Sequence, residues 1–386
     1  MEVKQVYSLL NTVTGEVTGK TDLVSEDLSN IVDVGKTLLS NTDVDNYVRT
    51  LINRVGKTVF DDRKYAGIAP NLLMDSWQFG SILQKISADL PVASENISSE
   101  LTDGTDYSPN IFYKPTVRQK LFNKRVTFEV NLSFTDRQVR ESFDSADQLN
   151  AFYSMLYSCV ENSLTIKIDS LIMRSIANMI GETIHDDFGS TSTSTTSHIK
   201  AVNLLSLYND QAAVQVSSVA DFLRSAECLQ FATYVINTYK DRLAVASQLF
   251  NIGGSVRFTQ ADDLTCVLLS DFAHKCNSIL RSNTFNADMV ALPEKSLYVP
   301  FWQGSGTDYS FASVSKIDVT TASGDTIEQA GILGVMFDRN SVAVCNSDRR
   351  VTTNYNPRGE FYTNFFKYDC SYINDLNENF VVFFLA

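Results

Sequence analysis

The segment Phe380–Ala386 limits the possible folds of this chain more than any other part of it. It reads FVVFFLA and contains no charged residue and no proline. Left exposed, a run of residues that favour β-strands would be an aggregation hazard. We therefore expect it to be buried as a strand of a sheet. A turn at Asn356–Gly359 and a run rich in aromatic residues precede it.

Composition describes an ordinary globular protein with an acidic surface. The 386 residues are 44% hydrophobic and 20% charged, enough for two or three domains. The 24 Phe and 16 Tyr suit sheets and subunit interfaces. A net charge of −13 argues against a surface that grips nucleic acid.

Cysteine spacing and hydropathy exclude several further classes. The six cysteines lie far apart with no CxxC pair, so neither a zinc site nor a redox motif is indicated. They are typical of reduced, buried thiols. The amino-terminal residues lack a signal-peptide pattern, and no apolar run approaches the roughly 20 residues that span a bilayer. We expect neither export by that route nor membrane insertion.

Two segments carry clear periodic patterns. Residues Arg125–Phe134 alternate polar and apolar side chains, which predicts a strand with one face buried. Residues 145–181 keep the apolar spacing of a helix, with Ser145 as N-cap and Gly181 as its end. At 1.5 Å per residue this helix would be roughly 50 Å long. A helix of that length is more typical of an elongated molecule than of a compact core.

Charge is segregated on either side of residue 110. Between Ser87 and Tyr107 there are acids and no bases: Asp89, Glu95, Glu100, Asp103 and Asp106. Between Phe112 and Arg140 bases dominate: Lys114, Arg118, Lys120, Lys124, Arg125, Arg137 and Arg140, against Glu129 and Asp136. The pattern fits two solvated loop faces. It also fits a two-stranded arm whose charges meet complementary charges on a neighbouring subunit.

The remaining segments show weaker patterns. Apolar residues from Leu38 to Val55 recur at helical spacing, and a Ser/Thr-rich break occupies residues 189–197. Beyond it, helices and strands alternate. Helices are predicted near 217–232, 234–249 and 271–282, and strands near 265–269, 297–302, 311–319, 327–337 and 341–345.

No catalytic, cofactor-binding or metal-binding residues are indicated. The chain has three histidines and no GxSxG, HExxH or Walker-type glycine loop. His185, Asp186 and Asp187 are adjacent, so they cannot all face one ion, and a polar cluster at a helix end is the better interpretation. Trp77 and Trp302 could stack on nucleobases, but no basic groove accompanies them.

The order of these parts resembles the major capsid protein of tailed bacteriophages, with the Hong Kong 97-type fold. It is closer still to the major head protein of small short-tailed phages of the phi-twenty-nine-like and picovirus-like groups. The segments that carry the resemblance are Phe112–Pro115 leading into Lys120–Phe122, Val139–Phe143 before the long helix, Ile332–Arg339 followed by Val342–Val344, and Asn356–Gly359 running into Tyr362–Phe366.

The resemblance implies an α+β fold with named parts. These are an N-arm and N-terminal helix in 1–60; an extended E-loop hairpin with flanking peripheral-domain strands in 61–137; a peripheral domain in 138–199 with spine helix 145–181; an α/β axial domain in 200–345; and C-terminal strands returning to the peripheral domain in 346–386. The E-loop would contact a neighbouring subunit through Asp89, Glu95, Glu100, Asp103, Asp106, Lys114, Arg118, Lys120, Lys124 and Arg125. The expected core of the peripheral domain is Leu149, Phe152, Leu156, Val160, Phe380 and Phe383.

It also implies a function without catalysis. The chain would self-assemble into pentamers and hexamers of an icosahedral or prolate head that encloses double-stranded DNA and contacts it weakly. A separate scaffolding protein and a portal protein are the other expected partners, with no cofactor and no membrane. The protein would be located in the virion. Its assembly would take place in the host cytoplasm. The alternatives are another virion component, a portal or tail protein, or an intracellular enzyme with an α/β site in 200–345.

Overall fold

The computed structural model describes most of the chain beyond residue 82. The described residues are 11–12, 73–74, 83–91, 93, 95, 100–135, 146–189, 196–283, 292–293, 296–303 and 308–386. The helical pattern expected from Leu38 to Val55 lies outside them, as does nearly all of the N-arm. The chain divides into two compact units. Unit 1 comprises Met1–Gln78, Arg125–Ile172 and Val344–Ser371, and unit 2 comprises Phe79–Lys124, Met173–Ala343 and Tyr372–Ala386.

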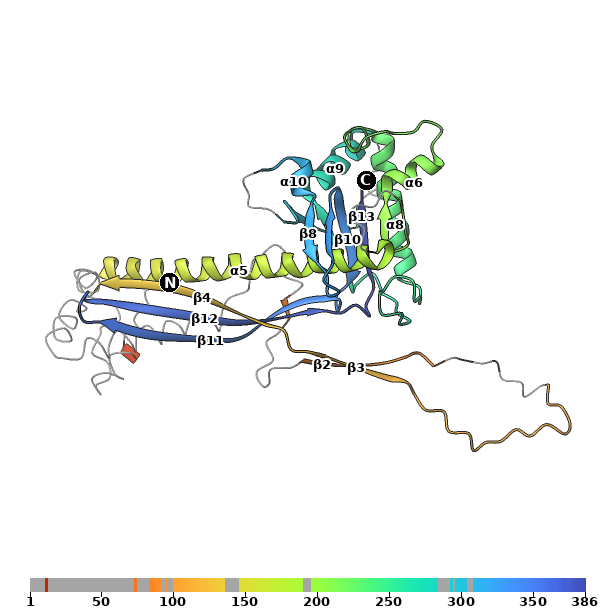
Figure 1. Ribbon diagram of the computed structural model, residues 1–386, viewed down its shortest axis with the longest axis horizontal. Coiled ribbons are helices and arrows are strands. Elements are labelled where there is room, and N and C mark those ends of the chain that lie inside the picture. Colours follow the sequence, from red (N-terminus) through yellow and green to blue (C-terminus); the bar gives the residue numbers. More distant parts are fainter. Residues whose placement is uncertain are drawn as a thin grey trace. The chain divides into compact units, whose positions relative to one another are not determined.

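Unit 1 is built on a four-stranded sheet with strand order β1-β11-β12-β4 (Figure 1). Its strands are β1 (Leu73–Met74), β4 (Arg125–Thr135), β11 (Val342–Asn356) and β12 (Phe361–Asn374). β4 pairs antiparallel with β12 along its whole length. Val126, Phe128 and Val130 are less exposed than the polar residues between them. The strand predicted from the alternation is therefore confirmed.

The turn between β11 and β12 follows from one side chain. Asn356 Oδ1 accepts hydrogen bonds from the backbone N–H groups of Arg358 (3.0 Å) and Gly359 (3.2 Å). Asparagine commonly nucleates turns in this way. The turn expected at Asn356–Gly359 is confirmed.

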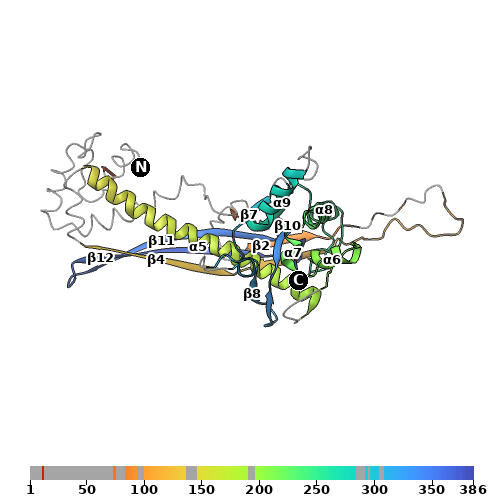
Figure 2. The same ribbon diagram turned by 90° about the horizontal axis from the view of Figure 1, so that it is seen from above.

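Helix α5 (Ala146–Phe188) is longer than the sequence pattern predicts (Figure 2). Val160, Leu164, Ile168 and Ile172 are buried at intervals of four residues, as the pattern requires. The expected end at Gly181 is wrong. A Cβ at position 181 would lie 3.3 Å from the Cβ of Val319, so the missing side chain permits close packing inside unit 2.

The helix ends instead at Gly189. This residue has φ +73°, and its N–H donates to the carbonyl of His185 at 2.7 Å. Glycine reaches that left-handed conformation without steric cost, which explains why the helix stops here.

Unit 2 is built on a five-stranded sheet with strand order β5-β13-β10-β6-β7. Its strands are β5 (Ala201–Asn203), β6 (Leu264–Leu269), β7 (Ser296–Val299), β10 (Ile332–Asp338) and β13 (Phe380–Phe384). Its helices are α6 (Leu204–Gln211), α7 (Val219–Phe222), α8 (Ala226–Leu243), α9 (Ser270–Asn283) and α10 (Phe311–Val314). Every residue of the central strands β13, β10 and β6 is buried. This sheet forms the core of unit 2.

The carboxyl-terminal strand is buried as expected, but in a different sheet. We expected Phe380–Ala386 to join the strands just before it, whereas β13 pairs antiparallel with β10 and parallel with β5. The unit 1 sheet alternates polar and apolar residues and suits one wet face. A continuous apolar run needs cover on both faces. Phe380 accordingly stacks on Phe337, with ring centroids 5.3 Å apart, and Phe383 meets Tyr239 edge-on at 5.5 Å.

Three details between residues 200 and 345 differ from the sequence patterns. The strand expected near 327–337 is two strands in different sheets, Thr326–Gln329 and Ile332–Asp338. The two helices expected in 217–249 are the short α7 followed by a single α8, whose first turn is capped by Ser225. The strand expected at 311–319 is α10 followed by β8 (Ile317–Thr320). β8 pairs with β9 (Thr326–Gln329) in a separate two-stranded sheet.

A second two-stranded sheet is the hairpin arm. It consists of β2 (Leu83–Ala88) and β3 (Val117–Phe122), paired antiparallel from Leu83↔Phe122 to Ala88↔Val117. The described part of the link between these strands contains no helix or strand. Both strands belong to unit 2.

Candidate assembly interface

Both strands of the hairpin arm are bonded to one buried carboxylate. Lys85 Nζ lies 2.6 Å from Asp375 Oδ2, and Lys120 Nζ lies 3.0 Å from Asp375 Oδ1. The two lysines face each other across the hairpin. Like charges in that position repel, and the carboxylate between them removes the repulsion. Only 1% of the Asp375 surface is exposed.

The same cluster extends to a second acid. Glu378 Oε1 lies 2.8 Å from Lys85 Nζ and 3.5 Å from Arg257 Nε. We call these residues, Lys85, Lys120, Arg257, Asp375 and Glu378, the hairpin root. They tie the arm to the segment before β13.

Electrostatics keep Asp375 ionised in this cluster. Burial alone raises the pKa of its carboxyl group. The hydrogen bond and charge of Lys85, the N–H of Asn377 and the charge of Lys120 outweigh burial and hold that pKa below its usual value. Asp375 therefore acts as a carboxylate at neutral pH.

Arg118 adds a further contact close to the root. Its Nε lies 3.1 Å from Asp89 Oδ2, and its Nη1 donates to Ser255 Oγ at 2.9 Å. Three residues expected to reach a neighbouring subunit, Asp89, Arg118 and Lys120, thus make ion pairs inside their own subunit. Long-range contacts of this kind leave no trace in local sequence patterns.

The other expected contact residues are distributed differently. Lys124 Nζ lies 5.9 Å from the ring centroid of Tyr372, and Arg125 begins β4. The remaining five are exposed and form no ion pair within the part of the chain that the structure describes. They are Glu95, Glu100, Asp103, Asp106 and Lys114.

The two faces of the hairpin differ in character. All the charged residues of its strands, Lys85, Arg118 and Lys120, lie on the face bonded to unit 2. The opposite face consists of uncharged, exposed residues: Gln84, Ile86, Ala88, Leu90, Val117, Gln119 and Leu121. We call this surface the uncharged face. Leu101, Ile111, Phe112 and Tyr113 in the link are exposed as well.

Of the expected core residues, only some can be compared with the structure. Val160, Phe380 and Phe383 are buried. Leu149, Phe152 and Leu156 lie in α5, but their side chains are outside the described part. Phe380 and Phe383 pack in the core of unit 2, as described above.

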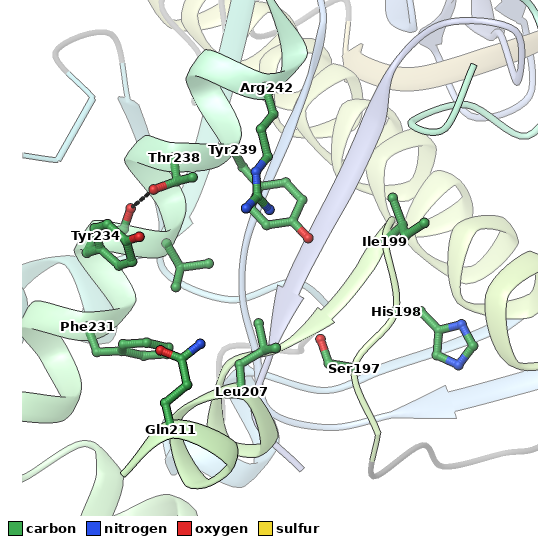
Figure 3. Close-up of a pocket in the computed structure, with 11 residues that line it drawn as sticks. Ser197, His198, Ile199, Leu207, Gln211, Phe231, Tyr234, Thr238, Tyr239 and Arg242 are labelled. Carbon is green, nitrogen blue, oxygen red and sulfur yellow. Dashed lines mark hydrogen bonds between the residues drawn. The ribbon is translucent and has the colours of Figure 1, made fainter. Parts of the chain in front are cut away.

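A pocket of about 400 Å³ lies in unit 2, lined by residues of α6, α8 and the segment 197–199 (Figure 3). The Arg242 guanidinium stands over the Tyr239 ring at 5.0 Å. His198 packs edge-on against Phe188, with centroids 4.6 Å apart. The lining contains no carboxylate and no thiol. Its serine, Ser197, accepts a hydrogen bond from the Asn203 N–H at 3.2 Å.

The polar residues at the end of α5 form the structural cluster that the sequence indicates. Asp187 Oδ2 accepts from the N–H groups of Lys200 (3.0 Å) and Ala201 (2.8 Å), and Asp186 pairs with the Lys200 ammonium group. His185 Nε2 lies 2.9 Å from Asp325 Oδ2. The described residues contain no group of three or more His, Cys, Asp or Glu that could hold a metal ion.

Cys228, Cys266, Cys276, Cys345 and Cys370 are buried and form no disulfide. Burial raises the pKa of the Cys266, Cys276 and Cys370 thiols to about 12 in each case. Such thiols stay protonated and unreactive at neutral pH. None of the described helices is both long and apolar enough to cross a bilayer.

The sequence matches one protein-family model over residues 8–384. That family is described as the Phi29-like phage major capsid protein. The chain belongs to this family. As a major capsid protein it is a structural component of the virion that forms the head shell, and it is not an enzyme. No curated protein sequence matches it significantly.

Solved structures show the same capsid fold. A chain in the capsid structure of Staphylococcus phage Andhra is 13% identical, with a TM-score of 0.53 over 85% of this chain and 86% of that one. A chain in the structure of the head fiber and inner core protein gp22 of native bacteriophage P68 is 11% identical, with a TM-score of 0.50 over 84% and 86%. The α+β capsid fold expected from the resemblance is confirmed.

Proposed function

We propose that this major capsid protein assembles into pentamers and hexamers of a closed shell around packaged double-stranded DNA. The hairpin arm carries the proposal. It is anchored to its own subunit through the root, while its link presents exposed charged and aromatic side chains. Many modest contacts of this kind add up to a stable closed assembly.

The parts of the fold take roles in this proposal. The arm within 61–137 is the E-loop, the unit 1 sheet with α5 is the peripheral domain, and 1–60 form the N-arm. The axial domain is the five-stranded sheet with its helices, and it includes β13 as well as residues 200–345. The pairing of β13 with β10 and β5 supports this assignment.

The exposed charges of the link give the arm its register on a neighbouring subunit. Glu95, Glu100, Asp103, Asp106 and Lys114 are available for this role. Lys120 in the root and the neighbouring ion pair of Arg118 with Asp89 support the arm from its own subunit. Lys124 and Arg125 lie where the arm joins β4. Complementary charges fix orientation more than they add affinity.

The other partners follow from the same role. Packaged DNA is contacted weakly, because a chain of net charge −13 has little attraction for phosphates. A separate scaffolding protein directs closure, and a portal protein occupies one vertex. Assembly takes place in the host cytoplasm.

Particle formation tests the proposal directly. The protein is expressed with and without a candidate scaffolding protein and imaged by negative-stain electron microscopy. Shells, or sheets of capsomers, are the expected result. A chain that stays monomeric at high concentration under both conditions would contradict it.

A further inference from the structure

One face of the hairpin arm lacks both charge and cover. Of the seven residues of the uncharged face, four are large and apolar: Ile86 is 63% exposed, Val117 57%, Leu121 56% and Leu90 52%. The other three are Gln84, Ala88 and Gln119. Six of the seven residues come from the two strands, and the pairing of β2 with β3 places those six on one side. Leu90 lies two residues beyond the end of β2.

This arrangement is the reverse of what solvent exposure favours. A two-stranded arm that keeps one face in water normally carries polar or charged side chains on that face. Here all three charged residues of the strands, Lys85, Arg118 and Lys120, point toward their own unit instead. An apolar hairpin face left open would invite aggregation. Its composition therefore suits a surface that becomes buried.

The composition also restricts what can cover the face. It offers no Lys or Arg to phosphate groups, so neither DNA nor an anionic lipid surface is attracted to it. Two copies of a chain with net charge −13 repel each other, and an uncharged face is where they can approach at least cost. The link adds further exposed apolar residues: Leu101, Ile111, Phe112 and Tyr113. A capsid protein meets other copies of itself at high local concentration.

We propose that the uncharged face of the hairpin packs against a second copy of this chain, while the charged face only anchors the arm to its own subunit. This inference rests on the proposed assembly and adds to it the surface that becomes buried. Contact area comes from the uncharged face, and register comes from the charges of the link. The root contributes to assembly by holding the arm in place.

A matched pair of double variants tests this division. Val117→Gln with Leu121→Gln makes the uncharged face polar. Val245→Gln with Leu249→Gln makes the same chemical change at residues with the same spacing and similar exposure, 66% and 57%. Circular dichroism and urea unfolding of unassembled protein establish that both variants are folded. Critical concentrations for assembly are then measured by sedimentation and negative stain.

We expect the 117/121 variant to raise the critical concentration at least about tenfold, the scale of losing central apolar interface contacts, and the 245/249 variant to change it less than about twofold. If the wild-type protein forms shells and the 117/121 variant has the same critical concentration, this inference is overturned and the proposed assembly still stands. An equal loss in both variants would overturn it too. A wild-type chain that never assembles would remove both proposals.

A cross-linking experiment gives a second readout that does not depend on tolerance of the double variants. A benzophenone attached at Gln119→Cys should link subunits covalently in assembled shells. Cys228, Cys266, Cys276, Cys345 and Cys370 are buried and should label slowly. Wild-type protein taken through the same labelling is the control for the remaining Cys159. If the benzophenone is consumed in assembled shells and no covalent dimers are found, the proposal is contradicted.

Discussion

A single carboxylate, Asp375, stabilises both strands of the hairpin arm because it lies between two lysines that would otherwise repel. Its partners come from β2, β3 and the segment before β13, and the ion pairs are 2.6–3.0 Å long. Removing a charged partner from such a buried network leaves the other charges unpaired, which costs more than the pair contributes. At the residue scale, the root is thus the most sensitive point of the arm.

Asp375→Asn should lower the free energy of unfolding by about 1.5–3 kcal/mol, the range for a hydrogen bond to a charged group. Urea unfolding of unassembled protein measures it. Glu328→Gln is the control, because its ion pair with Lys316 is exposed on both sides and should contribute much less to stability than the root. Equal losses in the two variants would show that the root has no special role.

The pH dependence of stability should identify the same group. The pKa of Asp375 is lowered in the folded state, so its stabilising contribution is present above the unfolded pKa of about 3.9. It disappears as the pH falls through the lower folded value. Wild-type protein and Asp375→Asn should therefore differ in urea midpoint at pH 7 and converge below about pH 4. A difference that persists at low pH would assign the effect to packing.

At the scale of elements, the apolar strand β13 joins the chain end to the core of unit 2. It is central in its sheet, and its side chains contact β10 and helix α8. Because both faces are covered, its contribution to stability comes from packing rather than from charge. The hairpin arm is the opposite case, since one face and the link remain exposed.

Phe383→Ala should destabilise unassembled protein by about 3–5 kcal/mol, because it empties a fully buried site beside Tyr239. Phe112→Ala is the matched control: Phe112 is 84% exposed, and its truncation should change stability by less than about 0.5 kcal/mol. Chemical unfolding measures both. A small effect at Phe383 would contradict the position of β13 in the core.

At the scale of the whole molecule, an acidic chain has to assemble against its own repulsion. In the hairpin arm, the ion pairs of the root form within one subunit. The charges of the link remain available for contact with a neighbouring subunit. Reversing Arg118 and Lys120 would disturb anchoring and docking together. Charges of the link are the cleaner probe of contact between subunits.

Asp103→Lys with Asp106→Lys should raise the critical concentration for assembly several-fold and leave the unfolding midpoint unchanged, because both residues are exposed. The control is Asp210→Lys with Asp241→Lys, two exposed acids outside the arm. Each double variant changes the net charge by +4, from −13 to −9. Sedimentation of the assembled fraction compares them. If the two variants behave alike, net charge and not the link controls assembly.

The sequence by itself determined the elements whose patterns are local. The alternation in Arg125–Phe134 specified a strand with one buried face, and the spacing in α5 specified a long helix. The turn at Asn356 and the burial of Phe380–Phe384 followed in the same way. Each depends on side chains a few residues apart, so periodicity and composition are sufficient.

Only the tertiary structure decided which distant segments meet. Lys85 and Asp375 are 290 positions apart, and nothing near either residue indicates the other. Partners remote in sequence also determine which sheet contains β13. The same is true of the continuation of α5 past Gly181. Lys120, one of the charges that suggested contact with a neighbour, pairs with a buried carboxylate of its own subunit that lies 255 positions away. The carboxyl-terminal run had to be buried for its composition alone, but its partners were set by packing.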